Sequence, residues 1–141
     1  MEKTFTVPAS LQNLAAVASF VEGELQQHNC SGKIITKINI AVDEIASNII
    51  KYAYVDLSGD IMVAVDVNED EKIIRLTFTD GGVKFNPLEL KEPDVTLSAE
   101  ERKIGGLGFF IVKKYMDEIT YSYEDGKNIL TLIKSYGEER Q

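Results

Sequence analysis

The sequence predicts an α+β fold, a two-layer sandwich in which about three helices cover one face of a mixed, mostly antiparallel sheet. Three observations carry this prediction: two amphipathic helical periods follow each other near the N-terminus, two pairs of strand-like runs are each joined by turn residues, and one short helix lies between the pairs. The element order is β-α-α-β-β-loop-α-β-β. A chain of 141 residues is the size of one domain, so we expect a single domain over residues 1–141.

The N-terminal part of the chain predicts one strand and two helices. Residues 4–7 alternate in polarity as a short strand does, and Pro8 follows them. An apolar period then predicts a helix over about 11–27, and Ser31 can cap a second helix that runs to about Tyr54. The core positions expected on these helices are Leu11, Leu14, Val17, Ala18, Val21, Leu25, Ile34, Ile38, Ala41, Val42, Ile45, Ile49 and Ala53.

The middle of the chain predicts a hairpin and a long loop. Residues 59–67 and 72–79 are rich in Ile, Val and Thr, and the polar residues 68–71 between them are typical of a turn. Residues 80–104 have no sustained period and contain glycines and prolines. Because ordinary structureless connections rarely exceed about 12–15 residues, we expect this loop to have a function.

The C-terminal part of the chain predicts one helix and a second hairpin. Glycines at 105, 106 and 108 open a helix that runs from Phe109 to about Asp117. Residues 118–123 and 128–133 then form two strands joined by a turn that contains Asp125 and Gly126.

The charge and composition exclude several classes of protein. The net charge is −8, which argues against direct binding of nucleic acid or of an anionic membrane surface. No run approaches the ~18 apolar residues of a membrane span, and the N-terminal segment is not a convincing secretion signal. The single cysteine, Cys30, cannot form an internal disulfide, which suits a reducing compartment. We therefore expect a cytoplasmic protein.

Glu44 and Asn48 are the first candidate site. They are four residues apart, so they are neighbours on the second helix, beside its apolar stripe. A carboxylate and a carboxamide at one point could supply a proton acceptor and an oxygen ligand for Mg²⁺. The alternative is an ordinary solvated edge of an amphipathic helix.

Asp80 and Gly82 are the second candidate site, directly after a predicted strand. A buried carboxylate there could accept a hydrogen bond from a ligand, and the glycine would let that ligand lie against the backbone. The alternative is an ordinary Asp-Gly turn.

The segment Gly105-Gly106-Leu107-Gly108 is the third candidate site, at a predicted helix start. Helix N-termini present unpaired N–H groups and a partial positive charge, and glycines let phosphate oxygens approach them. The segment is neither a Walker A sequence nor a Rossmann fingerprint, and a flexible hinge of the loop is the alternative.

The order of these three sites resembles that of the GHKL (Bergerat-fold) ATP-binding superfamily, and within it the chain looks like the anti-sigma-factor serine/threonine protein kinases. AVDEIASNIIKYAY resembles the N box of that family, TDGGVKFNP its first glycine box, and GGLGFFIVKKYMDEITY its second. The resemblance spans roughly residues 5–134, which is nearly the whole chain.

The resemblance implies a role for each candidate residue. Glu44 would be the general base, Asn48 the Mg²⁺ ligand, and Asp80 the acceptor of the adenine amino group of ATP. Gly82 would let the base approach, and the loop from about residue 84 to 104 would be the ATP lid. The phosphate-binding residues would be Gly105, Gly106, Leu107 and Gly108, with Arg102 near the γ-phosphate.

The resemblance also implies the partners. The protein substrate would be an anti-anti-sigma (STAS-type) protein, the rival partner a sigma factor, and the chain a homodimer. One alternative is a nucleotide-dependent binding module that keeps the fold and has lost phosphate transfer. The other is the catalytic domain of a histidine kinase. The sequence argues against this alternative, because it contains no dimerising helical segment with a phosphoacceptor histidine.

The chain departs from the family pattern at four places. Tyr52 stands where many members have histidine, and Gly81 is an unusually small middle residue of the Asp-x-Gly box. Arg102 is separated from Gly106 by three residues, and Asn128 and Ile129 lie near the place of a threonine that often contacts adenine.

Overall fold

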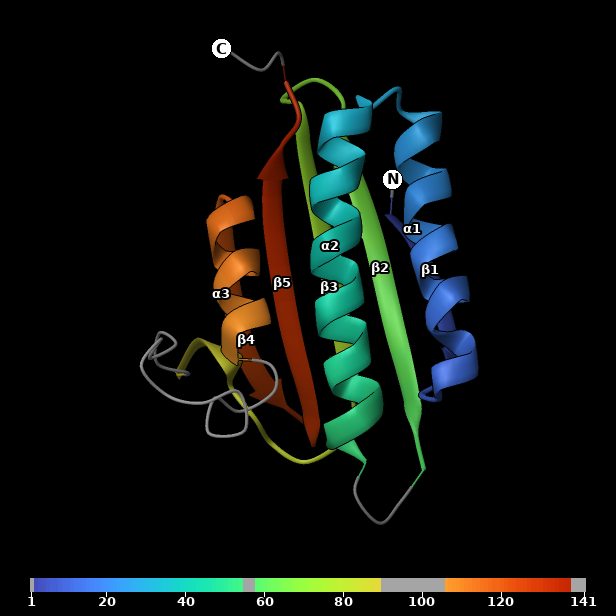
Figure 1. Cartoon of the computed structure of the whole chain (residues 1–141), viewed down its shortest axis with the longest axis vertical. Coiled ribbons are helices and arrows are strands. Elements are labelled where there is room, and N and C mark those ends of the chain that lie inside the picture. The colour runs from blue at the N-terminus through green and yellow to red at the C-terminus, as the bar shows by residue number, and fades with distance from the viewer. Residues whose placement is uncertain (1, 55–57, 90–105, 138–141) are drawn as a thin grey trace.

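The computed structural model describes residues 2–54, 58–89 and 106–137, and it confirms the α+β two-layer fold. Five strands form one sheet in the order β1-β2-β3-β5-β4, and the three α-helices lie on one face of it (Figure 1). The elements in chain order are β1 (Glu2–Pro8), a 3₁₀ turn (Leu11–Asn13), α1 (Leu14–Gln27), α2 (Gly32–Asn48), a π-helical turn (Ile49–Ala53), β2 (Asp60–Asn68), β3 (Ile73–Asp80), a 3₁₀ turn (Pro87–Glu89), α3 (Gly106–Tyr115), β4 (Glu118–Glu124) and β5 (Lys127–Ser135).

The sheet is antiparallel in every pairing that the described residues make, where the sequence predicted a mixed but mostly antiparallel sheet. The strand β5 lies between β3 and β4 and runs antiparallel to both. The strands β3 and β4 therefore point the same way without pairing. The crossover that contains α3 connects these two strands, and the hairpin return of β5 fills the space between them.

The core lies between the helices and the sheet, as the apolar periods predict. Fully buried side chains come from both layers: Val17, Val21 and Leu25 of α1, Ile34, Ile38 and Val42 of α2, Val112 of α3, and Ile61, Val63, Ile74, Leu76, Phe78 and Leu132 of the sheet. The expected core residue Leu11 is instead 63% exposed. It lies in the 3₁₀ turn before α1, and a turn of three residues rotates it off the apolar face of the α-helix that follows.

Two helix ends decide the geometry of the candidate site. The Ser31 side chain accepts a hydrogen bond from the Ile34 N–H at 3.2 Å, which confirms the predicted cap of α2. At its other end α2 widens into the π-helical turn, which places Tyr54 just beyond it. The helix α3 begins at Gly106, earlier than the predicted Phe109, so Gly106 and Gly108 form its first turn.

The candidate residues gather at one end of the molecule. The end of β3, the start of β5, the first turn of α3 and the C-terminal end of α2 all lie at the lower end of Figure 1. Among the helices that the structure describes, none is long and apolar enough to cross a membrane.

Candidate functional site

Glu44 and Asn48 are hydrogen-bonded on the side of α2 that faces α3. The Asn48 Nδ2 donates to Glu44 Oε2 at 2.7 Å, and both side chains are half-buried. A carboxylate only accepts hydrogen bonds, so the amide must present its nitrogen to Glu44. The Asn48 Oδ1 is therefore the amide atom turned away from Glu44. On that side it could serve as an oxygen ligand for a hard cation.

The first turn of α3 lies directly against the Glu44 carboxylate. A Cβ atom added to Gly108 would lie 2.1 Å from Glu44 Oε1 and 2.6 Å from Glu44 Oε2. Only a residue without a side chain allows this approach. The contact places a carboxylate beside a helix N-terminus, where the unpaired N–H groups and the helix dipole favour negative charge.

Asp80 is buried at the end of β3, with 7% of its surface exposed. Its Oδ1 accepts hydrogen bonds from the Gly82 N–H at 2.9 Å and from Asn128 Nδ2 at 3.0 Å. Within the described part of the chain Oδ2 accepts none. Among the described residues the carboxylate is thus held through one oxygen, and the other could accept a hydrogen bond from a ligand.

Asn128 uses its whole hydrogen-bonding capacity to hold this end of the sheet. Its Nδ2 donates to Asp80 Oδ1 and to the Val83 carbonyl at 2.9 Å. Its Oδ1 accepts from the Phe85 N–H at 3.0 Å and from the Tyr121 hydroxyl at 2.5 Å. One buried side chain therefore orients Asp80 and also fixes the segment that follows β3.

The sequence marked Asn128 only as a departure from the family pattern. The residue is the pairing partner of Asp80 on β5. This relation joins positions 48 residues apart, and only the register of the sheet shows it. An asparagine at the start of a strand is the one local signal, and it does not point to Asp80.

Gly82 packs against the end of the π-helical turn. A Cβ atom added there would lie 2.2 Å from the Ala53 carbonyl oxygen, and the Val83 N–H donates to the same oxygen at 2.8 Å. The close packing of these two backbone segments thus explains why position 82 is a glycine. Its predicted role in letting a base approach stays a prediction.

Tyr54 joins three segments at this end, and the sequence did not mark it as a site residue. Its hydroxyl donates to the Asp60 carbonyl at 2.7 Å and accepts from the Gly81 N–H at 2.7 Å, while its ring lies against Gly59. Burial raises the pKa of this hydroxyl above its usual range, and the Gly81 hydrogen bond opposes that rise less strongly. Tyr52, at the position where many family members have histidine, is 47% exposed.

The other predicted residues are placed in part. Gly106 and Leu107 lie in the first turn of α3 with Gly108, as phosphate binding through backbone amides requires. Gly105 and Arg102 lie outside the described residues, as does most of the predicted lid.

The donor set suits Mg²⁺ better than an ion that needs a full protein cage. The described residues contain no group of three or more His, Cys, Asp or Glu side chains that could hold a metal. Mg²⁺ is commonly held by one or two protein oxygens together with phosphates and water. Asn48 Oδ1 can be such an oxygen, so the residues present fit this ion.

Curated relatives have similar sequences. A serine-protein kinase RsbW from Listeria monocytogenes is 28% identical over 143 aligned residues, covering 98% of this chain and 88% of the relative. A serine-protein kinase RsbW from Bacillus mycoides is 25% identical, covering 88% of this chain and 79% of the relative. These names agree with the resemblance to the anti-sigma-factor kinases.

Solved structures share the fold. The RsbU and RsbW domains of Rv1364c from Mycobacterium tuberculosis match with a TM-score of 0.70 at 17% identity, covering all of this chain and 34% of that chain. This chain thus spans about a third of the chain in that structure. A blue-light activated histidine kinase from Erythrobacter litoralis matches with a TM-score of 0.61 at 16% identity, covering 94% of this chain and 43% of that one.

The family profile of the histidine kinase-like ATPase domain matches residues 7–134, from the end of β1 to the end of β5. This match includes Glu44, Asn48, Asp80 and the first turn of α3. The chain therefore belongs to the histidine kinase-like ATPase domain family.

Proposed function

We propose that the chain is a cytoplasmic serine/threonine protein kinase that transfers the γ-phosphate of ATP to an anti-anti-sigma (STAS-type) protein and so controls a sigma factor. The names of the curated relatives support a serine kinase. The observation that carries the proposal is the contact of the Glu44 carboxylate with the first turn of α3, beside Asn48. A carboxylate, a carboxamide and the amides of a helix N-terminus thus lie together, and they could serve as proton acceptor, Mg²⁺ ligand and phosphate-binding groups.

The nucleotide would bind between Asp80 and the first turn of α3. Asp80 Oδ2 would accept a hydrogen bond from a base that offers an amino group, as adenine does. The backbone amides of Gly106, Leu107 and Gly108 would hold the phosphate oxygens. Mg²⁺, held by Asn48 Oδ1, would neutralise charge on the phosphates.

Glu44 would act on the protein substrate. As the hydroxyl oxygen of a serine or threonine forms its bond to the γ-phosphorus, Glu44 takes the hydroxyl proton. The bond between the γ-phosphorus and the bridging oxygen breaks, and its electron pair leaves with ADP. The products are a phosphorylated partner and ADP.

The sigma factor would be the rival partner, and the active species would be a homodimer. Binding of a STAS-type protein and of a sigma factor to the same chain would then compete. Phosphorylation of the STAS-type protein would decide which partner remains bound.

The test combines phosphate transfer with nucleotide binding. The protein is mixed with labelled Mg-ATP and the STAS-type protein of the same organism, and we expect label on a serine or threonine of that protein. Glu44→Gln keeps the shape of the side chain and removes its basicity, so it should abolish transfer and leave ATP binding intact. Asn48→Ala should lose the Mg²⁺-dependent part of ATP binding in a calorimetric titration.

The control is Asp70→Asn, which changes an exposed acid in the turn between β2 and β3 and should leave both measurements unchanged. Full transfer by Glu44→Gln would contradict the role of Glu44. ATP binding without any transfer by the unmodified protein would indicate the binding module instead. Tyr52, which replaces the usual histidine, favours that second candidate.

A further inference from the structure

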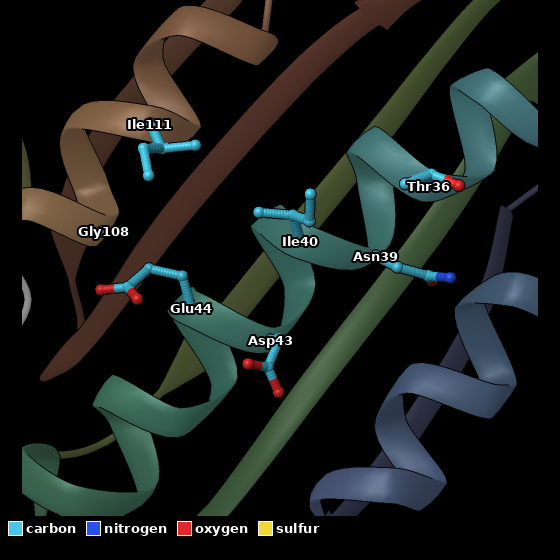
Figure 2. A pocket seen from close by; sticks show the side chains of 7 residues that line it. All are labelled: Thr36, Asn39, Ile40, Asp43, Glu44, Gly108 and Ile111. Carbon is cyan, nitrogen blue, oxygen red and sulfur yellow. The ribbon is translucent and has the colours of Figure 1, made fainter.

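A groove of about 370 Å³ lies between α2 and α3 on their solvent side (Figure 2). One wall is formed by Thr36, Asn39, Ile40, Asp43 and Glu44 of α2, and the other by Gly108 and Ile111 of α3. The proposed reaction uses Glu44 and Gly108 but gives no role to the rest of the groove.

The groove ends at the proposed catalytic carboxylate. Residues four apart follow one line along a helix, and Ile40, Glu44 and Asn48 form such a line on α2. Asn48 contacts Glu44 from the C-terminal side, toward Asp80, and the groove reaches Glu44 from the N-terminal side. The groove therefore meets the proposed nucleotide site at Glu44 and Gly108.

Each wall of the groove carries one exposed apolar side chain. Ile40 is 41% exposed and Ile111 is 36% exposed, and the two side chains lie on opposite walls (Figure 2). The exposed acid Asp43 also lines the groove, next to Glu44. This combination suits a segment that brings an apolar side chain and carries no negative charge of its own.

We propose that this groove binds the segment of the protein substrate that carries the phosphoacceptor hydroxyl. The inference rests on the proposed kinase function and adds to it the place and the chemistry of substrate recognition. Phosphoryl transfer needs the attacking and leaving oxygens roughly in line on opposite sides of phosphorus. ADP would leave on the side of Asp80, so the acceptor hydroxyl must approach phosphorus from the side opposite ADP and within reach of Glu44, and the groove reaches Glu44.

The spacing of the groove residues predicts the sequence of the acceptor. Ile40 and Glu44 are four residues apart, which is ~6 Å along the helix. An extended chain advances ~3.3 Å per residue and points alternate side chains to the same side. An apolar residue two positions from the acceptor serine or threonine would therefore contact Ile40 and Ile111. Next to Asp43 and Glu44, an acidic residue at that position would be repelled.

The experiment measures phosphate transfer to the STAS-type protein by Ile40→Ala, Ile111→Ala and the double variant. Alanine keeps the helices and adds no charge near Glu44. For the double variant we expect kcat/KM to fall about tenfold or more, mainly because KM rises. A loss of this size is what removal of buried isoleucine contacts would cause. Affinity for Mg-ATP should not change. The matched control is Leu11→Ala, which removes an exposed apolar side chain outside the groove.

A second arm uses synthetic peptides that contain the acceptor residue and its flanking sequence. Aspartate two positions from the acceptor should block transfer, whereas aspartate one position away, on the opposite side of an extended chain, should not. Equal effects at the two positions would overturn the proposed binding mode.

The remaining outcomes separate the groove from the kinase function. If the unmodified protein and the double variant both transfer phosphate fully, the proposed role of the groove is overturned and the kinase function is not. No transfer by the unmodified protein would overturn both. A double variant that loses Mg-ATP affinity or changes its oligomeric state would identify the groove as part of the nucleotide site or as a contact between copies, and would also overturn the proposal.

Discussion

Asn128 donates a hydrogen bond from its side-chain nitrogen to Asp80 Oδ1 at 3.0 Å, between directly paired residues of β5 and β3. Both residues are 7% exposed. The Asp80 carboxylate is thus oriented from the sheet as well as from the Gly82 N–H of the loop that follows. The orientation of the proposed adenine contact therefore depends on the pairing of two strands.

Replacement of Asn128 by aspartate should destabilise the protein at neutral pH. Aspartate has the same shape but cannot donate to Asp80 or to the Val83 carbonyl, and it adds a second carboxylate at the same point. The expected loss is about 2 kcal/mol or more in the free energy of unfolding, measured by urea denaturation.

Lys127→Ala is the control for this variant, because it changes the exposed neighbour on the same strand. It should leave stability nearly unchanged. A fully stable Asn128→Asp protein at neutral pH would show that the side chain does not hold Asp80 as described.

Two glycine-to-alanine substitutions should have opposite effects on stability. A Cβ atom at Gly82 would meet the Ala53 backbone, which cannot move cheaply, so Gly82→Ala should cost about 1–3 kcal/mol. A Cβ atom at Gly23, inside α1, meets nothing within 4 Å, so Gly23→Ala should stabilise the protein by about 0.5–1 kcal/mol. Thermal unfolding of the two variants measures the difference. Equal effects would contradict the close packing at Gly82.

Gly108→Ala should reduce phosphate transfer with little loss of stability. The atoms that its Cβ would meet are the far end of the Glu44 side chain, which can rotate away. The fold is then kept, but the carboxylate is displaced, and displacements of ~1 Å can lower rates about a hundredfold. Transfer kinetics and thermal unfolding are measured on the same sample. A stable variant with full transfer would show that the position of Glu44 does not limit the reaction.

Tyr54 should make stability depend on pH in the alkaline range. Burial raises the pKa of its hydroxyl, so the folded protein holds this proton more tightly than the unfolded chain. The stabilisation is complete below the unfolded pKa of about 10 and is lost as the pH rises through the higher folded value. Ionisation also removes the donor to the Asp60 carbonyl.

The measurement compares Tyr54→Phe with the unmodified protein. Near neutral pH the variant should be less stable by about 1 kcal/mol, because it loses both hydrogen bonds of the hydroxyl. The difference should narrow as the pH is raised from about 9 to about 11. A difference that stays constant over this range would contradict the assigned pKa direction.

The sequence by itself determined the elements and the local parts of the site. Helical and strand periods are local properties, and so are the Ser31 cap and the two-residue turn at Asp125 and Gly126, both of which have positive φ. The pairing of Glu44 with Asn48 follows from one turn of a single helix. The candidate site at Asp80 required a buried carboxylate after a strand, and Asp80 is 7% exposed at the end of β3.

Only the tertiary structure decided the contacts between segments far apart in the chain. The register of β3 with β5 brings Asn128 to Asp80, and the packing of α3 on α2 brings Gly108 to Glu44 and forms the groove beside it. Such contacts depend on the angle and offset at which whole elements pack. Residues near each other in the sequence set the shape of each element, but the shared core sets how the elements lie against one another.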